Sequence, residues 1–146
     1  MNFDSYDEET AAGIMALDDA SGGLPRYLGL TTTDVGPGHL TAEIAVRDDL
    51  LNPFGTLHGG VLAALIDHVL GAVMYPLVPR GTWVATTELK LNLIAPVREG
   101  VLSARAEVLS MSRRLGVVRI DATNLDRLVG AAQGTVTITE PRPKPA

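Results

Sequence analysis

The chain has 146 residues, of which 46% are hydrophobic and 20% are charged, and its formal net charge is −5 at pH 7. This composition favours one compact domain over a disordered chain, and the acidic balance argues against a nucleic-acid-binding protein, which normally carries a basic face. Because there is no cysteine, disulfides, thiol catalysis and cysteine-ligated metals are excluded, and three separated histidines form no zinc motif, so no metal or cofactor is expected.

In chain order, the first predicted elements are a helix and two strands. Residues 1–20 are acidic and mildly helical, and the following Ser-Gly-Gly sequence and Pro25 are expected to end this helix. Residues 27–33 predict a short strand, and residues 34–38 predict a turn. Apolar and polar residues then alternate over residues 40–47, which predicts a half-buried strand.

The middle of the chain predicts a loop over residues 48–56 and then a long helix. Residues 61–75 are apolar or small on nearly every face, which is typical of a helix surrounded by other structure. Pro76 and Pro79 are expected to end this helix. Asp67 interrupts the apolar run, so we interpret the segment as a core helix rather than a membrane span.

The second half of the chain predicts four strands joined by short turns, with glycines that ease the curvature of a sheet. The strands are expected around residues 88–93, 101–109, 118–122 and 130–139, and the glycines are Gly116, Gly130 and Gly134.

This order of elements predicts a single α+β domain in which a curved antiparallel sheet packs on one helix. The domain is expected over residues 1–146, with residues 1–25 as an N-terminal extension and residues 141–146 as a loose tail. The N-terminal residues show no basic segment followed by an apolar run, so we expect a cytoplasmic protein with neither membrane nor nucleic acid as a partner.

Two glycines at the start of the long helix indicate a place where a carbonyl oxygen can bind. The first N–H groups of a helix have no internal partner and lie at the positive end of its dipole. Gly59 and Gly60 leave these groups unobstructed, which suits an oxygen that becomes negative during a reaction. The alternative is that both glycines only allow close packing between loop and helix.

Asp67 is the second candidate for chemistry, because an unpaired carboxylate in an apolar helix is costly and such groups concentrate at working sites. It follows Gly59 by eight residues, or about 12 Å along the helix axis. A base must lie within about 3 Å of the group on which it acts, so the two residues can cooperate only if Asp67 comes from a second, antiparallel copy. The sequence therefore predicts a two-fold dimer with two equivalent sites, unless Asp67 only makes a structural hydrogen bond or ion pair.

The loop before the helix carries further polar candidates. Asn52 and His58 can either hydrogen-bond a substrate carbonyl or fix the loop, and Thr56 is expected to cap the helix. The sequence contains neither a Gly-x-Ser-x-Gly nucleophile motif nor a phosphate-binding or dinucleotide-binding fingerprint.

The chain resembles the hotdog-fold acyl-CoA thioesterases of the phenylacetate-degradation type, and the similarity extends from about residue 28 to residue 139. The residues that carry it are Asn52-Pro-Phe-Gly55-Thr-Leu-His58-Gly59-Gly60, followed by Asp67. The resemblance implies a hotdog fold, in which a curved sheet wraps one helix, and hydrolysis of an acyl-CoA to a free acid and coenzyme A.

The resemblance also implies a role for each candidate residue. The N–H of Gly59 holds the thioester oxygen, while Asn52 and His58 shape that side of the site. Asp67 of the partner subunit acts on water as a general base, or acts as the nucleophile. Thr86 positions the water, and it is expected on the strand face shared by Glu88 and Lys90; the alternative is an ordinary strand threonine.

Coenzyme A and the assembly complete these expectations. Gly60 is placed with the substrate-binding residues, and Arg113 and Arg114 are expected to bind the phosphates, with Lys90 and Arg119 as weaker candidates. All four basic residues are open to the alternative of a surface position without a ligand. The expected assembly is a homodimer, with a homotetramer of two dimers as its extension.

Two other functions fit the same fold. One is a protein that binds an acyl-CoA without hydrolysing it. The other is a hotdog hydratase or dehydratase, which the sequence favours less because His68 directly follows Asp67 instead of lying a few residues beyond it, and adjacent helix residues point about 100° apart. We therefore interpret His68 as structural.

Overall fold

A computed structural model describes residues 3–17 and 22–140, so the predicted tail at 141–146 lies outside the described residues. Its helices are α1 (Glu8–Ala16), α2 (Gly23–Leu28) and α3 (Gly59–Ala72), with short 3₁₀ helices η2 (Asp48–Leu50) and η3 (Tyr75–Leu77). Its strands are β1 (Leu30–Gly36), β2 (His39–Ala45), β3 (Trp83–Leu93), β4 (Val101–Met111), β5 (Leu115–Asn124) and β6 (Arg127–Thr139).

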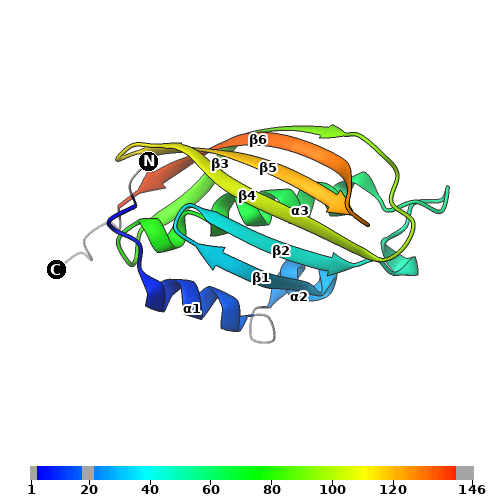
Figure 1. Ribbon diagram of the computed structural model, residues 1–146, viewed down its shortest axis with the longest axis horizontal. Coiled ribbons are helices and arrows are strands. Elements are labelled where there is room, and N and C mark those ends of the chain that lie inside the picture. Colours follow the sequence, from blue (N-terminus) through cyan, green and yellow to red (C-terminus); the bar gives the residue numbers. More distant parts are fainter. Residues whose placement is uncertain (1–2, 18–21, 141–146) are drawn as a thin grey trace.

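The six strands form one antiparallel sheet in the order β1-β2-β4-β5-β6-β3. The sheet curves around α3, while α1 and α2 lie beside β1 (Figure 1). The predicted α+β hotdog arrangement, a curved sheet around one long helix, is therefore confirmed. Strands β1 and β3 each pair with only one other strand of the described chain, so the sheet has two open edges.

Helix α3 buries one side against the sheet. Its fully buried residues are Leu62, Leu65, Ile66, Val69 and Leu70. The helix approaches the sheet closely because glycines replace side chains beneath it: a Cβ on Gly134 would lie 2.5 Å from a methyl group of Leu70. Gly130 and Gly134 thus make room for side chains of the helix, and Gly116 makes room for Met74, which follows it.

The opposite side of α3 differs from the prediction of a helix enclosed all round. Gly60 and Asp67 are exposed and Gly71 is half-buried. These three positions recur at seven and four residues, so they lie along one face of the helix. The sheet covers only one side of α3, and the described chain adds no layer over this face.

The segment before β1 also differs from the prediction. Residues 27 and 28 belong to helix α2 rather than to a strand, and Pro25 lies inside this helix instead of preventing it. Proline is tolerated here because the first helical N–H groups lack intrahelical partners. Gly29, with a φ of 65°, ends the helix in the left-handed region before β1 begins.

The N-terminal helix α1 is tied to the rest of the fold at its first turn. Asp7 caps the helix by accepting from the N–H groups of Glu9 and Thr10, and it also pairs with Arg80 at 2.8 Å. The Arg80 guanidinium, followed by the backbone N–H of Thr10, holds the pKa of Asp7 well below its usual value. Residues from the N-terminal extension thus contact the segment that follows η3.

By length and composition alone, the segment Gly59–Leu77 is apolar enough to cross a membrane. However, 56% of the most apolar window is buried inside the fold, as expected for a core helix. This agrees with the interpretation of the segment from the sequence.

Candidate active site

His58 caps the start of α3. Its Nδ1 accepts the Gly60 N–H at 2.9 Å, and its carbonyl accepts the Val61 N–H at 2.9 Å. A neutral histidine that accepts at Nδ1 carries its hydrogen on Nε2, so the exposed ring can still donate one hydrogen bond outward. The cap is therefore His58 and not Thr56 as predicted, because the hydroxyl of Thr56 instead accepts from Asn52 at 2.8 Å.

The Gly59 N–H has no acceptor among the residues that the structure describes, whereas the N–H groups of Gly60 and Val61 are both used. Gly59 lines a cleft of about 270 Å³ together with Asn52, Leu62 and Leu93. A Cβ at position 59 would lie 2.9 Å from a methyl group of Leu93. Glycine at this position therefore leaves an unpaired donor at the positive end of α3 beside an open cleft.

Asn52 closes the loop that leads to this cleft. Its Oδ1 accepts the N–H groups of Phe54 and Thr56 at 2.9 and 3.3 Å, and its backbone N–H donates to the Thr56 carbonyl at 2.7 Å. The Asn52 side chain thus fixes the loop, which was the alternative to a hydrogen bond with the substrate. Asn52 still shares the cleft with Gly59, while His58 and Gly60 line a different hollow beside α2.

Asp67 is exposed in this chain, whereas the sequence suggested a buried carboxylate. The difference arises because Asp67 lies on the side of α3 that the sheet does not cover. It lines a groove bounded by α2 and the start of β1, on the other flank of the helix from the Gly59 cleft. One chain therefore does not bring Gly59 and Asp67 together, as the helix geometry predicted.

Thr86 lies on the opposite strand face from the predicted one. It pairs with Val136, but Glu88 pairs with Thr135, so the intervening Thr87 forms a bulge that shifts the register. Directly paired residues share a face, which places Thr86 on the helix side with buried Val136, and Glu88 on the outer side. Thr86 is exposed on the open edge strand β3.

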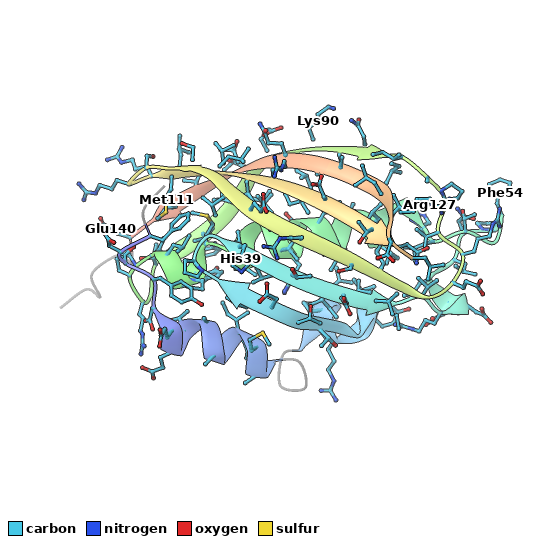
Figure 2. The ribbon with its side chains drawn as sticks, in the orientation of Figure 1. His39, Phe54, Lys90, Met111, Arg127 and Glu140 are labelled. Carbon is cyan, nitrogen blue, oxygen red and sulfur yellow. The ribbon has the colours of Figure 1, made fainter. Side chains whose placement is uncertain are left out.

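The predicted phosphate-binding arginines lie at the other end of the molecule from Gly59. Figure 2 shows Met111 and Glu140 at one end and Phe54 and Arg127 at the other. Arg113 pairs with Glu140 at 2.9 Å, and Arg114 lies in the same turn between β4 and β5. The charge of Arg113 is therefore already compensated within the chain.

Lys90 and Arg119 lie on the outer face of the sheet. Both are paired across strands with Gln133, and Lys90 points away from the body of the molecule in Figure 2. Arg119 also forms an ion pair with Glu107. Because α3 packs on the inner face, neither side chain reaches the Gly59 cleft of its own chain, which argues against their predicted role there.

Two arginines that the sequence did not single out lie next to residues that line the Gly59 cleft, since Arg98 follows Val97 and Arg127 contacts Pro96. Arg98 donates to the Gly55 carbonyl at 3.2 Å, and Arg127 donates to the Pro96 carbonyl at 2.7 Å. Neither has a carboxylate partner in the described part of the chain. No sequence pattern distinguishes them from other surface arginines; only their position does. Within residues 3–17 and 22–140, no group of three or more His, Asp or Glu side chains is arranged to hold a metal.

Comparison with known proteins supports one family. The thioesterase superfamily matches residues 54–131 of this chain. Human acyl-coenzyme A thioesterase 13 is 29% identical over 101 residues, which are 68% of this chain and 71% of that protein. A thioesterase from Haemophilus influenzae superposes with a TM-score of 0.83 at 25% identity, over 91% of this chain and 94% of that chain. A phenylacetic acid degradation-related protein from Ralstonia eutropha gives a TM-score of 0.74 at 26% identity, over 81% and 93%.

Proposed function

Because this chain belongs to the thioesterase superfamily, it is a thioester hydrolase, and we propose that its substrate is an acyl-CoA, cleaved to a free acid and coenzyme A. The observation that carries this proposal is the unpaired Gly59 N–H at the start of α3, beside a cleft. A donor fixed in this way stabilises the oxyanion that forms when a thioester carbonyl is attacked. The similarity to human acyl-coenzyme A thioesterase 13 supports coenzyme A as the carrier.

In the proposed mechanism, the thioester oxygen accepts a hydrogen bond from the Gly59 N–H of one subunit. Asp67 of the partner subunit lies beside the carbonyl carbon. As a general base, Asp67 removes a proton from water, the hydroxide adds to the carbonyl carbon, and the C–S bond then breaks. The protonated Asp67 gives this proton to the departing thiolate, so coenzyme A leaves as the thiol and Asp67 is regenerated. Asn52 fixes the loop on the Gly59 side, and the Nε2–H of His58 is available to the substrate. Direct attack by Asp67, followed by hydrolysis of the resulting anhydride, is the alternative route.

The proposed dimer interface combines the unpaired edge of β3 with the uncovered face of α3. Strand β3 has an unpaired edge, and the uncovered face of α3 carries small residues beside Asp67. An unpaired strand edge is a template for pairing with another chain. A two-fold axis next to β3 would place the α3 helices antiparallel and would bring the exposed Thr86 to the interface. We propose that Thr86 positions the attacking water there, and that two such dimers form the expected homotetramer.

The same geometry suggests where the phosphates of coenzyme A bind. In antiparallel helices the start of one lies near the end of the other, so Arg113 and Arg114 of one subunit approach the Gly59 cleft of its partner. Arg98 and Arg127 already lie at this cleft within the chain itself. Guanidinium groups suit phosphates because they donate in a planar fork.

Replacing Arg113 and Arg114 together with alanine is expected to raise KM for acyl-CoA about tenfold and to leave kcat nearly unchanged, since phosphate contacts are equal in the ground and transition states. Steady-state kinetics at two salt concentrations would measure this effect. Arg105→Ala, which removes an exposed arginine from the outer face, is the matched control. An unchanged KM in the double variant would remove both residues from the site.

The proposed function is tested by measuring thiol release from short, medium, long and aromatic acyl-CoAs. Turnover that depends on the acyl group is expected. Tight acyl-CoA binding without turnover would instead favour the non-catalytic binding protein, and hydration of an enoyl-CoA without thiol release would favour the hydratase.

A further inference from the structure

Three hollows that share lining residues form a largely apolar groove along α3, on the flank that carries Asp67. The hollow that contains Asp67 has a volume of about 200 Å³, and its walls include Leu24 and Leu28 of α2, Leu30 of β1 and Ala64 of α3. Leu24, Leu28 and Ala64 also line a second hollow of about 380 Å³ that extends to His58. Leu30 lines a third, of about 160 Å³, that extends to Ile14 of α1.

We infer that this groove binds the acyl group of the substrate, and that α2 determines which acyl chains are accepted. The inference rests on the proposed function, because it takes Asp67 to act at the thioester carbon. The acyl chain begins at that carbon and must extend from Asp67, and the walls on this side are largely apolar. An elongated groove of this kind suits an extended aliphatic chain better than an acetyl group.

This placement divides the substrate between the two subunits. The subunit that supplies Gly59 holds the carbonyl oxygen, and the coenzyme A moiety lies at its cleft, where the arginines of both subunits meet the phosphates. The subunit that supplies Asp67 holds the acyl chain between its own α2 and α3. Each methylene buried in such a groove improves binding about fourfold, from the transfer free energy of one CH₂ group. The ratio kcat/KM is therefore expected to rise with chain length until the groove is full.

Helix α2 forms the outer wall of the groove, and Arg47 holds this helix in position. It donates to the carbonyl of Leu28 at 2.9 Å and to that of Tyr27, it pairs with Asp49 at 2.8 Å, and its guanidinium lies 5.6 Å from the centre of the Tyr27 ring. A helix of six residues is not stable by itself, so its position depends on such contacts. Arg47 is thus a positioning residue for the groove and touches neither Asp67 nor Gly59.

The experiment compares kcat/KM across saturated acyl-CoAs of two to twelve carbons for wild type, Ala64→Leu and Arg47→Ala. Ala64→Leu fills the groove and is expected to lower the value for the ten-carbon and twelve-carbon substrates at least tenfold, while the shortest substrate changes less than twofold. Arg47→Ala is expected to raise KM for the long-chain substrates and to leave kcat for the short-chain substrates unchanged. Arg26→Ala, which removes the arginine within α2 itself, is the matched control and should keep the wild-type dependence of kcat/KM on chain length.

The outcomes separate the two proposals. Turnover of the shortest substrate by each variant shows that it is folded and catalytically competent. A chain-length profile that Ala64→Leu leaves unchanged, or lowers equally at every length, would overturn the groove while the thioesterase stands. If wild type hydrolyses no member of the series, the groove is overturned, and thiol release from aromatic acyl-CoAs decides whether the proposed acyl-CoA thioesterase stands.

Discussion

Replacing Asp67 with asparagine is expected to lower kcat at least about 100-fold, because the amide cannot accept a proton from water. The substitution keeps the size of the side chain and its ability to hydrogen-bond. Asp67 is exposed within its own chain, so the free energy of unfolding of the monomer should change little. Thiol release measured beside thermal unfolding would therefore separate the loss of chemistry from a loss of structure.

Asp121→Asn is the matched control, since Asp121 is an exposed carboxylate on β5, on the other side of the sheet from α3. It should retain wild-type kcat. A fully active Asp67→Asn protein would refute the mechanism. In a single turnover in ¹⁸O-labelled water, a general base would place the label in the released acid. A nucleophilic Asp67 would instead contribute one of its own oxygens to the acid when water attacks the Asp67 carbonyl of the anhydride, and the label would then enter Asp67.

Replacing Gly59 with proline is expected to lower kcat by about 100-fold to 1,000-fold, the usual effect of removing one oxyanion donor. Proline lacks the N–H but is well suited to the first position of a helix. The preceding His58 has a ψ of 131°, which is the backbone conformation that a residue before proline prefers. The helix should therefore form, and the loss of activity should reflect the missing donor.

Gly59→Ala distinguishes the effect of losing the N–H donor from the effect of adding a side chain at this position. Alanine keeps the donor, and its Cβ would press on the exposed, flexible Leu93 side chain at 2.9 Å, so a loss of less than about tenfold is expected, well below the oxyanion-donor effect. Equal activity in the proline and alanine variants would show that the Gly59 N–H does not stabilise the oxyanion.

Mixing the two inactive proteins tests whether the site is shared between subunits. A dimer of one Gly59→Pro subunit and one Asp67→Asn subunit has one site with both residues intact and one with neither. If subunits exchange freely, half of the dimers are mixed, so about a quarter of the wild-type activity should return. No recovery in a sample shown to contain mixed dimers would mean that Gly59 and Asp67 do not act in one site across the interface.

The architecture could be predicted from the sequence, because hydrophobic periodicity is a local property. The apolar run after Gly60 and the alternation along the strands predicted one core helix and the curved sheet around it. The motif from Asn52 to Gly60 predicted the family, since its glycines and histidine are needed at fixed positions for the turn into the helix. The helix rise of about 1.5 Å per residue also predicted that Gly59 and Asp67 cannot meet in one chain.

The local predictions that were wrong involve single residues that change a pattern. The bulge at Thr87 shifts the register by one residue, and a strand alternates with period two, so Thr86 moves to the opposite face. The sequence predicts that Pro25 keeps the chain from forming a helix, but its position in the first turn of α2 makes it compatible with one. Neither the register nor the helix start can be read from the composition of the segment.

Which side chains share a surface became clear from the packing of the elements in three dimensions. This packing exposed Asp67 on the side of α3 that the sheet does not cover, paired Arg113 with Glu140, and placed Arg98 and Arg127 next to residues of the Gly59 cleft. It also formed the groove between α2 and α3 from segments about 40 residues apart in the sequence. Such juxtapositions depend on how the elements pack together, and periodicity along the chain specifies the face of each element but not the neighbour that this face meets.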